Sequence, residues 1–181
     1  ATNTISTPVV ATITVTPTFE NGGVVCDGED ETFTITVNPT AQVDDITNQV
    51  VCNLDEVSVL FSTQNTSGTS IYSWTSDIEI GAGLSGTGDM NFTAINTSTA
   101  PVVASINVTP TFTSGGITNI GDVISFTITV NPTAQVDQPL DQLVCNGEGV
   151  SVLFTTQNTG GSTSYSWISD TQIGAGLSGN S

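Results

Sequence analysis

Apolar and polar residues alternate along much of the chain with a period of two. In Thr32–Val37 apolar residues alternate with threonine, and the later segment Ser125–Val130 does the same. This alternation is typical of a β-strand with one buried face, and Val, Ile, Thr and Phe favour strands. No stretch has the 3.6-residue apolar spacing of a helix, so an all-β protein is predicted. Further strands are predicted at Val9–Val15, Val57–Phe61, Ile71–Thr75, Met90–Ile95 and Val102–Val108.

The chain also repeats itself. Pro-Thr-Ala-Gln-Val-Asp stands at Pro39–Asp44 and again at Pro132–Asp137, 93 residues later. With this offset the copies align without a gap, and about 54 of the 88 overlapping positions are identical. A period of this length corresponds to a whole domain rather than to one turn of a solenoid. We therefore expect tandem antiparallel β-sandwich repeats of about 93 residues, each with about seven short strands.

The two copies indicate which residues face the core. Tyr72 and Trp74 are identical in the second copy, whereas Ile71 and Thr75, which flank this pair and are expected to face outward, differ. This is the behaviour of a strand with one buried face. Trp74 is therefore predicted to lie between the sheets, where its replacement by alanine would cost about 3–5 kcal/mol. Segments 57–61 and 150–154 are both Val-Ser-Val-Leu-Phe and are expected to share one conformation.

Prolines suggest the domain boundaries. Pro39 and Pro132 each follow an asparagine and precede a polar, extended connector, and proline cannot donate to a strand ladder. This phase predicts the C-terminal part of one repeat in residues 1–38, a complete repeat in 39–131 and the N-terminal part of the next in 132–181. The Gly-rich stretch Gly81–Asp89 is the alternative boundary.

The charge distribution excludes several functions. The chain has 17 acidic residues and no Lys, Arg or His, so its formal charge is −17. Nucleic-acid backbones and anionic membrane surfaces are bound chiefly through Lys and Arg, so neither is an expected partner. Without His or Lys there is no Ser-His-Asp or Cys-His pair, no imidazole zinc ligand and no Schiff-base lysine. The chain contains no run of about 18 apolar residues, so no membrane-spanning segment is predicted.

Two carboxylates invite a catalytic interpretation. Asp77 and Glu79 lie two residues apart, and paired carboxylates perform acid–base work in glycoside hydrolysis. The second copy has Gln172 in place of the glutamate, so the pair is not repeated. Two solvated charges near a turn are the favoured interpretation, and we assign no catalytic or cofactor-binding residue.

Calcium is the metal that an acidic chain would favour, because it takes oxygen ligands. The acidic run Asp27–Glu31 lacks the spacing of an EF-hand loop and is not kept in the second copy. Asp44 and Asp45 at the connector are a better place, but only Asp44 is matched, by Asp137. We assign no metal ligand and expect an acidic coat that keeps the protein soluble.

Several motifs together resemble the PKD-like repeats of giant bacterial surface adhesins of the SprB gliding-motility type. The resemblance covers essentially the whole chain and rests on Val15–Phe19, Val50–Asn53, Tyr72–Thr75, Ile80–Gly88 and Asn91–Asn96. It implies immunoglobulin-like sandwiches, type IX secretion and display at the outer membrane of the cell. The expected partners are then neighbouring repeats, surface polysaccharide or the substratum, and the secretion and motility machinery.

The resemblance also bears on the cysteines. In similar repeats a cysteine in the Val-Val-Cys-Asn strand has a partner late in the same domain, but the partner position of Cys52 holds Asn119. No disulfide is therefore expected within this chain. The alternative is a Cys26–Cys52 bridge closing a loop of about 27 residues, worth about 3 kcal/mol.

The resulting expectation is a non-catalytic repeat segment of an extracellular adhesin filament, serving as a structural stalk in surface attachment and gliding. Two alternatives stay open. One is a glycan-binding module, which would need aromatic side chains on an outer face. The other is a set of spacer repeats in a secreted polysaccharide-active enzyme, with the catalytic domain elsewhere.

Overall fold

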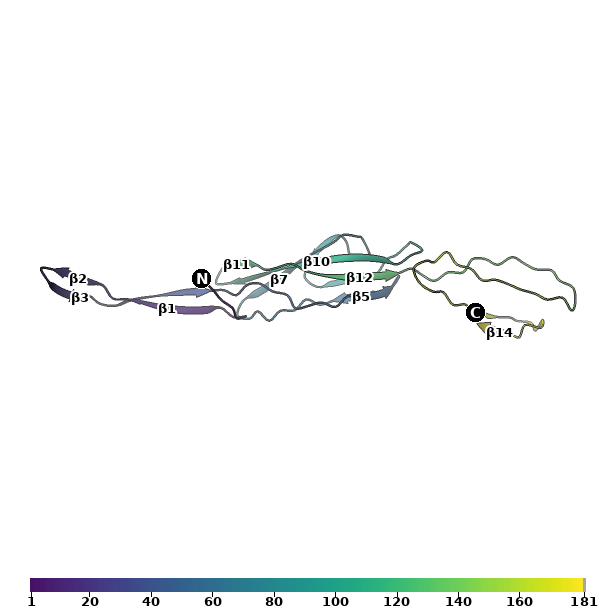
Figure 1. The fold of residues 1–181 in the computed structure, drawn as a ribbon, viewed down its shortest axis with the longest axis horizontal. Helices are drawn as coiled ribbons and strands as arrows, with labels where there is room; N and C mark the ends of the chain where they lie inside the picture. Colours follow the sequence, from purple (N-terminus) through teal and green to yellow (C-terminus); the bar gives the residue numbers. More distant parts are fainter. Residues whose placement is uncertain (181) are drawn as a thin grey trace.

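The computed structural model describes residues 1–180, in which all regular secondary structure is β-strand, as predicted. The chain forms a long, narrow rod with a compact sandwich between two thinner ends (Figure 1). The strands are β1 Val9–Val15, β2 Thr18–Asn21, β3 Val24–Asp27, β4 Glu31–Val37, β5 Gln49–Cys52, β6 Glu56–Val59, β7 Thr69–Ser76, β8 Ser85–Thr87, β9 Met90–Thr93, β10 Val102–Ser114, β11 Ile117–Ile120, β12 Ile124–Asn131, β13 Ser166–Ile168 and β14 Ser178–Asn180.

The central sandwich consists of strands β5 to β12. Its larger sheet has the strand order β5-β12-β10-β7-β8, and β11 pairs with the outer part of β10. Its smaller sheet is the pair β6-β9. Side chains of both sheets form one hydrophobic cluster, in which Val59 and Met90 pack together with Trp74, Ile106 and Ile128. The structure is therefore all-β and sandwich-like.

One strand pairing differs from the predicted antiparallel arrangement. The pairings between the described strands are antiparallel except that β5 runs parallel to β12, with Val51 opposite Val130. Hairpin turns impose antiparallel neighbours, whereas strands joined by a long connection can meet in either direction. β5 and β12 lie at the two ends of the sandwich sequence, so no turn constrains their direction.

Burial within the central sandwich follows the predicted period of two. In β7, Tyr72, Trp74 and Ser76 are buried, while the alternate residues Ile71, Ser73 and Thr75 are exposed. Trp74 retains only 6% of its accessible surface, which confirms it as a core residue. In the described chain, all buried residues lie between Pro39 and Val130, so the complete core sits in this one stretch. The alternative boundary at Gly81–Asp89 runs across this core, next to the fully buried Ile80.

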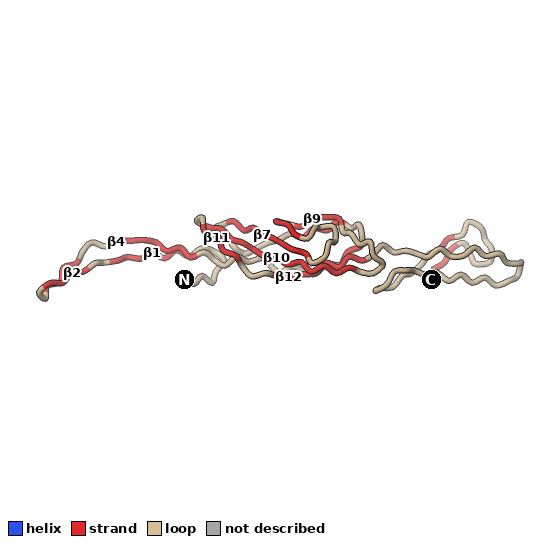
Figure 2. Tube along the Cα trace, turned by 90° about the horizontal axis from the view of Figure 1, so that it is seen from above, coloured by secondary structure: helices blue, strands red, loops and turns tan. Residues whose placement is uncertain are grey.

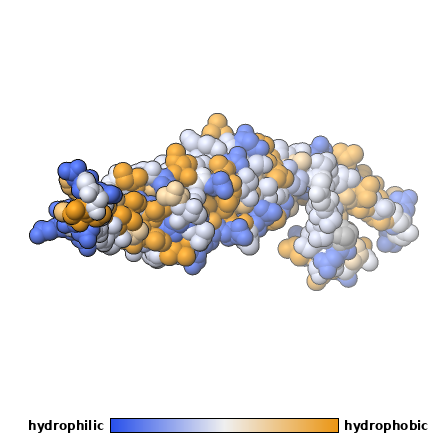
Figure 3. Space-filling view, turned by 60° about the vertical axis from the view of Figure 1, so that its left-hand side comes forward, coloured by the Kyte–Doolittle hydropathy of each residue, from blue (hydrophilic) through white to orange (hydrophobic). Residues whose placement is uncertain are grey.

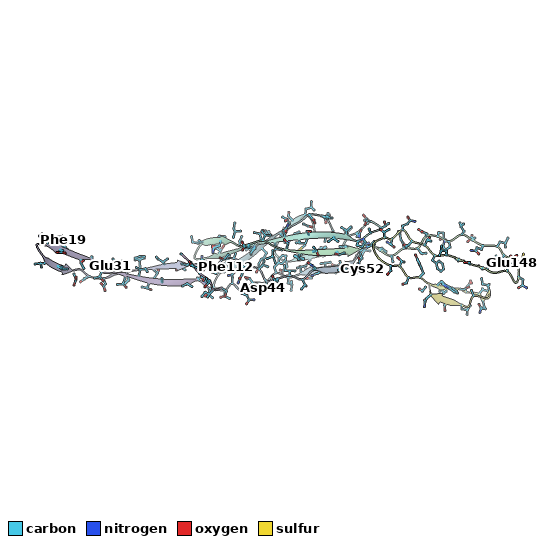
Figure 4. The ribbon with its side chains drawn as sticks, in the orientation of Figure 1. Phe19, Glu31, Asp44, Cys52, Phe112 and Glu148 are labelled. Carbon is cyan, nitrogen blue, oxygen red and sulfur yellow. The ribbon has the colours of Figure 1, made fainter. Side chains whose placement is uncertain are left out.

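The N-terminal hairpins have the same strand pairing as part of the central sandwich, but no second sheet packs against them. β1 pairs with β4 from Val9 opposite Val37, and β10 pairs with β12 from Val102 opposite Val130, 93 residues later. The small hairpin β2-β3 is likewise repeated as the outer part of β10 with β11. Phe19 and Phe112 hold the same place in successive hairpins (Figure 4). Residues 1–38 thus have native hairpin register but no facing sheet.

The C-terminal segment copies the opposite part of the sandwich. β13-β14 has the register of β7-β8, with Trp167 opposite Gly179 as Trp74 is opposite Gly86. Segments 57–61 and 150–154 were expected to share one conformation, but only the first contains a β-strand, β6. β6 is a strand through its pairing with β9, whereas no strand within residues 1–180 pairs with segment 150–154.

Successive parts of the chain are arranged end to end. The β1–β4 hairpins extend from one end of the sandwich, and the segment after Asn131 extends from the other (Figures 1 and 2). Figure 3 shows apolar side chains at the surface of the part that faces the viewer. Several of them belong to the hairpin strands, where Phe19 is 69% exposed and Phe33 is 51% exposed. These two residues are the counterparts of buried residues of the central sandwich.

Candidate functional site

The carboxylates of Asp77 and Glu79 both accept hydrogen bonds from backbone N–H groups. Asp77 Oδ1 accepts a hydrogen bond from the Ser105 backbone N–H at 2.7 Å. Glu79 Oε1 accepts from the N–H groups of Gly81 and Gly83 at 2.7 and 3.0 Å. Both glycines have positive φ, which a glycine adopts without strain, so the loop wraps around the carboxylate.

The second copy shows that this role needs no charge. Gln172, the counterpart of Glu79, accepts a hydrogen bond from Gly176 N–H at 2.9 Å through its amide oxygen. An amide oxygen can accept a hydrogen bond but cannot serve as a general base at neutral pH. The geometry therefore favours the interpretation that Glu79 orders a turn.

The acidic run at 27–31 joins β3 to β4 at the base of the small hairpin. Asp30 Oδ1 accepts a hydrogen bond from the Thr16 hydroxyl, which ties the two long strands together at that point. Within residues 1–180 no group of three carboxylates, cysteines or histidines lies close enough to hold a metal ion.

Asp44 and Asp137 form the same clasp in the two connectors. Asp44 N–H donates to the Ser62 carbonyl at 2.8 Å, and its carboxylate accepts from the Ser62 hydroxyl at 2.6 Å. Asp137 makes the equivalent contacts with Thr155, both at 2.8 Å. Asp45 is exposed and does not take part. Asp44, the candidate calcium ligand of the sequence analysis, therefore fastens the connector to the following loop.

Hydrogen bonding at the second clasp changes the acidity of Asp137. Gln157 Nε2 donates to Asp137 Oδ1 at 3.0 Å, and Thr155 donates to the other oxygen. These bonds stabilise the charged form and hold the pKa of Asp137 below its ordinary value of 3.8.

An asparagine in each copy completes the junction, a role that was not predicted from the sequence. Asn65 Oδ1 accepts from Gln42 N–H at 3.0 Å, and its Nδ2 donates to the Thr40 carbonyl at 3.2 Å. Asn158, 93 residues later, makes the same two contacts with Gln135 and Thr133 at 2.9 and 3.2 Å. The signal in the sequence was the identity of Asn-Thr in both copies.

Each junction also has one backbone hydrogen bond between adjacent units. Thr66 N–H donates to the Ser6 carbonyl at 3.0 Å, and Thr159 N–H donates to the Thr99 carbonyl at 2.8 Å. Both pairs are related by the offset of 93 residues. The same contacts therefore connect residues 1–38 to the central sandwich and the central sandwich to residues 132–180.

Close backbone contact makes the first junction compact. Asn119 Nδ2 donates to the Pro39 carbonyl, and Gly121 is packed directly against the Ala41 carbonyl, where a Cβ would overlap it. Asn119 occupies the position of Cys26 in the preceding copy. Here an amide side chain holds the connector, at the position where the family resemblance suggested a cysteine.

The aromatic residues of the central sandwich that recur in the second copy face inward. The rings of Phe61 and Tyr72 are 5.6 Å apart and tilted, and Phe154 and Tyr165 repeat this contact at the same distance. Burial of the Tyr72 hydroxyl raises its pKa above 10.0. Tyr72 and Trp74 therefore do not form the outward aromatic surface that a glycan-binding module requires.

An apolar groove of about 630 Å³ is open in the C-terminal segment. Each of its main lining residues is the counterpart of a core residue of the central sandwich. These residues are Val150, Val152, Phe154, Trp167 and Ile173. The contrast in exposure is large, because Ile173 is 77% exposed whereas its counterpart Ile80 is completely buried.

The N-terminal hairpin carries the opposite half of such a core. Phe33 is 51% exposed and its counterpart Phe126 is 3% exposed, although both lie in strands of the same register. We call this set the hairpin face: Ile13, Val15, Phe19, Phe33 and Ile35. Its central counterparts, Ile106, Val108, Phe112, Phe126 and Ile128, are all buried.

The three cysteines are free and exposed. Cys26 lies opposite Phe19 in the outer hairpin, whereas Cys52 ends β5 at the far side of the central sandwich (Figure 4). The Cys26–Cys52 bridge that the sequence left open is therefore not formed. This separation arises because the hairpin carrying Cys26 extends away from the sandwich.

By its fold, the chain belongs to the all-β proteins with two packed sheets. No protein-family model, curated protein or solved structure matches it. Within residues 1–180 there is no helix long and apolar enough to span a membrane.

Proposed function

We propose that the chain is a non-catalytic repeat segment of an extracellular bacterial adhesin, serving as a structural stalk of immunoglobulin-like, PKD-like repeats. The observation that carries this proposal is the recurrence of one set of junction contacts at an interval of 93 residues. Thr66 with Ser6, and Thr159 with Thr99, join successive units in the same way. Because each unit contacts the next through the same groups, such a junction can join any number of repeats into a linear array.

The path of force through the central sandwich suits a stalk. The chain enters at Pro39, beside Asn119, and leaves at Asn131, whose carbonyl accepts a hydrogen bond from Asn53 N–H at 2.9 Å. Tension between these points pulls the start of β5 and the end of β12 in opposite directions. Because β5 and β12 are parallel, their ladder is loaded in shear, and its hydrogen bonds share the load.

The charge of the chain fits the same role. Each chain has a net charge of −17 and no Lys, Arg or His, so neighbouring stalks repel each other and their side chains cannot form ion pairs. Like charge on neighbouring filaments also opposes edge-to-edge strand pairing, which is the common hazard of exposed sheets. The acidic side chains that were candidates for chemistry, Asp77, Glu79 and Asp44, hold backbone or side-chain donors. We therefore propose a load-bearing role for this segment, displayed outside the cell at the outer membrane.

The location is tested by labelling cells. Antibodies raised against residues 1–181 are expected to label intact source bacteria, and limited proteolysis of whole cells is expected to remove the signal. An unrelated periplasmic protein serves as the control for intact outer membranes. Labelling that requires permeabilisation would contradict the proposal.

The role as a stalk is tested by binding. Neighbouring repeats are the proposed direct partners, while polysaccharide, the substratum and the secretion machinery would contact other parts of the filament. A glycan array probed with the chain is therefore expected to give no saturable binding. Saturable binding that competes with free sugar would favour the glycan-binding module instead.

A further inference from the structure

We infer that a closed ring of hydrogen bonds locks successive repeats together, so that residues 1–38 and the central sandwich move as one stiff rod. Units of a chain that are joined by an exposed linker normally move relative to one another. The joint in this molecule differs in three respects: it has almost no linker, its contacts form a closed circuit, and a strained residue lies in that circuit. The stiffness would hold wherever the chain is displayed, so it is independent of the adhesin proposal.

The connector between the two units contains one residue that is held neither in a strand nor in a core. β4 ends at Val37, and Pro39 is already buried, with less than 2% of its surface accessible. Ala41 and Val43 follow at 3% and 8% exposure, and Val43 belongs to the hydrophobic cluster of the central sandwich. A bend between the units must therefore take place at Asn38, or it must pull Pro39 out of its buried site.

Asn38 is itself fixed to the unit that follows. Its Nδ2 donates to the carbonyls of Ser114 at 2.9 Å and Ile117 at 3.4 Å, on the two sides of the turn between β10 and β11. The Ser114 hydroxyl in turn donates to the Ser67 carbonyl at 3.0 Å. One side of the joint is thus tied from the end of β4, through that turn, to the loop that precedes β7.

The circuit closes on the other side of the joint. Thr66 N–H donates to the Ser6 carbonyl at 3.0 Å. The loop that carries Ser6 is braced by Asn3, whose Nδ2 donates to the Val37 carbonyl at 2.8 Å. Val37 precedes Asn38 in the chain, so the contacts return to their starting point, and we call this circuit the joint ring. Since the joint ring has no open side, the units cannot tilt or twist without stretching one of its links.

Ser67 has a backbone conformation that residues with a side chain rarely adopt. Its φ is +62°, and the residue at the same place in the second joint, Gly160, has a φ of +75°. Left-handed backbone at a non-glycine residue is costly and persists only where the surroundings enforce it. The adjacent Gly68 is packed against the ring of Phe112, where a Cβ would overlap it, so the loop is seated closely on β10. The strain is therefore explained by a loop that is shaped to complete the joint.

The second joint repeats two of these links 93 residues later. Asn96 Nδ2 donates to the Val130 carbonyl at 2.7 Å, as Asn3 does to that of Val37. Thr159 N–H donates to the Thr99 carbonyl at 2.8 Å. The recurrence of both links indicates that the joint ring belongs to the repeat.

Residual dipolar couplings of the full chain in a stretched neutral gel test the inference. The backbone N–H couplings of β1 and β4 report how strongly the hairpin is aligned, and those of β7, β10 and β12 report the alignment of the sandwich. In the wild type both sets are expected to fit one alignment tensor of equal magnitude. A double variant, Asn3→Ala with Asn38→Ala, removes two links of the joint ring. Its hairpin magnitude is expected to fall by about half or more relative to the sandwich, because an unbraced unit samples many orientations.

Asn48→Ala is the matched control. Asn48 Oδ1 accepts a hydrogen bond from Thr127 N–H at 2.8 Å, which lies within the sandwich and outside the joint ring. This substitution is expected to leave the two magnitudes equal. In every variant the couplings within β1 and β4 also show whether the hairpin keeps its register, with Val9 opposite Val37.

Three results would overturn the inference: unequal magnitudes in the wild type, equal magnitudes in the double variant, or the same loss in Asn48→Ala as in the double variant. A wild-type hairpin that does not keep its register would overturn it as well, since the joint ring could not then form.

Discussion

Replacing Asn96 with alanine is expected to destabilise the central sandwich by about 3 kcal/mol, because its side chain donates to a backbone carbonyl that water does not reach. Asn96 is 4% exposed. Its Nδ2 donates to the carbonyls of Val130 at 2.7 Å and Ala100 at 2.9 Å. Its Oδ1 accepts from the backbone N–H and the hydroxyl of Ser98 at 2.9 and 2.7 Å.

The magnitude follows from which of these groups stay buried. Val130 is completely buried, so losing the donor to its carbonyl costs about 1–3 kcal/mol. The bonds to Ser98 and Ala100 lie nearer the surface, where water replaces them, and their loss adds about 1 kcal/mol. The backbone N–H of Asn96, which donates to Asn53 Oδ1 at 2.7 Å, is unaffected by the substitution.

The chain contains a matched control. Asn3 is the counterpart of Asn96 and donates from Nδ2 to the carbonyls of Thr7 and Val37, both at 2.8 Å. Because Asn3 precedes β1 and lies outside the central core, Asn3→Ala is expected to change the stability of the sandwich by less than about 0.5 kcal/mol. The comparison separates the buried environment from the chemistry of the side chain.

Urea unfolding followed by Trp74 fluorescence measures the effect, with Trp167→Phe in every variant to leave one indole. For a slope of about 1–2 kcal/mol/M, Asn96→Ala should lower the midpoint by about 1.5–3 M. A change below about 1 kcal/mol, or an equal effect of Asn3→Ala, would refute the reasoning.

Three further predictions concern the core and the titrating groups. Gly86→Ala should cost about 1–3 kcal/mol in urea unfolding, because the new Cβ would overlap the indole of Trp74, and an unchanged midpoint would contradict this. Since burial raises the pKa of Tyr72 above 10.0, stability should be constant below pH 10 and fall as pH rises through the folded-state pKa; absorbance titration at alkaline pH, with the other tyrosine changed to phenylalanine, checks this. The pKa of Asp137 should lie below 3.8 in a ¹³C NMR titration, so the clasp contributes to stability above pH 3.8 and this contribution is lost as pH falls through the lower value. Gln157→Ala should return the pKa of Asp137 toward 3.8, and an unchanged pKa would argue against that hydrogen bond.

The individual strands could be predicted because their signals are local. The period-two pattern correctly located strands such as Val9–Val15 and placed Trp74 in the core. Comparison of the two copies separated inward from outward residues, since a buried face tolerates less change. Gly22 and Gly115, both with positive φ, lie in the turns that end such strands.

The candidate site was less accessible to sequence reasoning. The roles of Asp44 and Glu79 depend on which hydrogen-bond donors the fold brings to their carboxylates. A local sequence pattern does not show these donors. The structural roles of Asn65 and Asn96 were not predicted, because an asparagine in a threonine-rich chain carries no distinctive signal. Their importance comes from the carbonyls that the fold brings against them.

By itself, the amino-acid sequence determined the strands, the interval of 93 residues and the side of each strand that is suited to a core, because these depend on neighbours in the chain. Only the tertiary structure decided the parallel pairing of β5 with β12 and the separation of Cys26 from Cys52. It also decided that Phe126 is buried while Phe33, in an almost identical strand, is exposed. The physical reason is that burial requires a facing sheet, and that sheet comes from residues far away in the sequence.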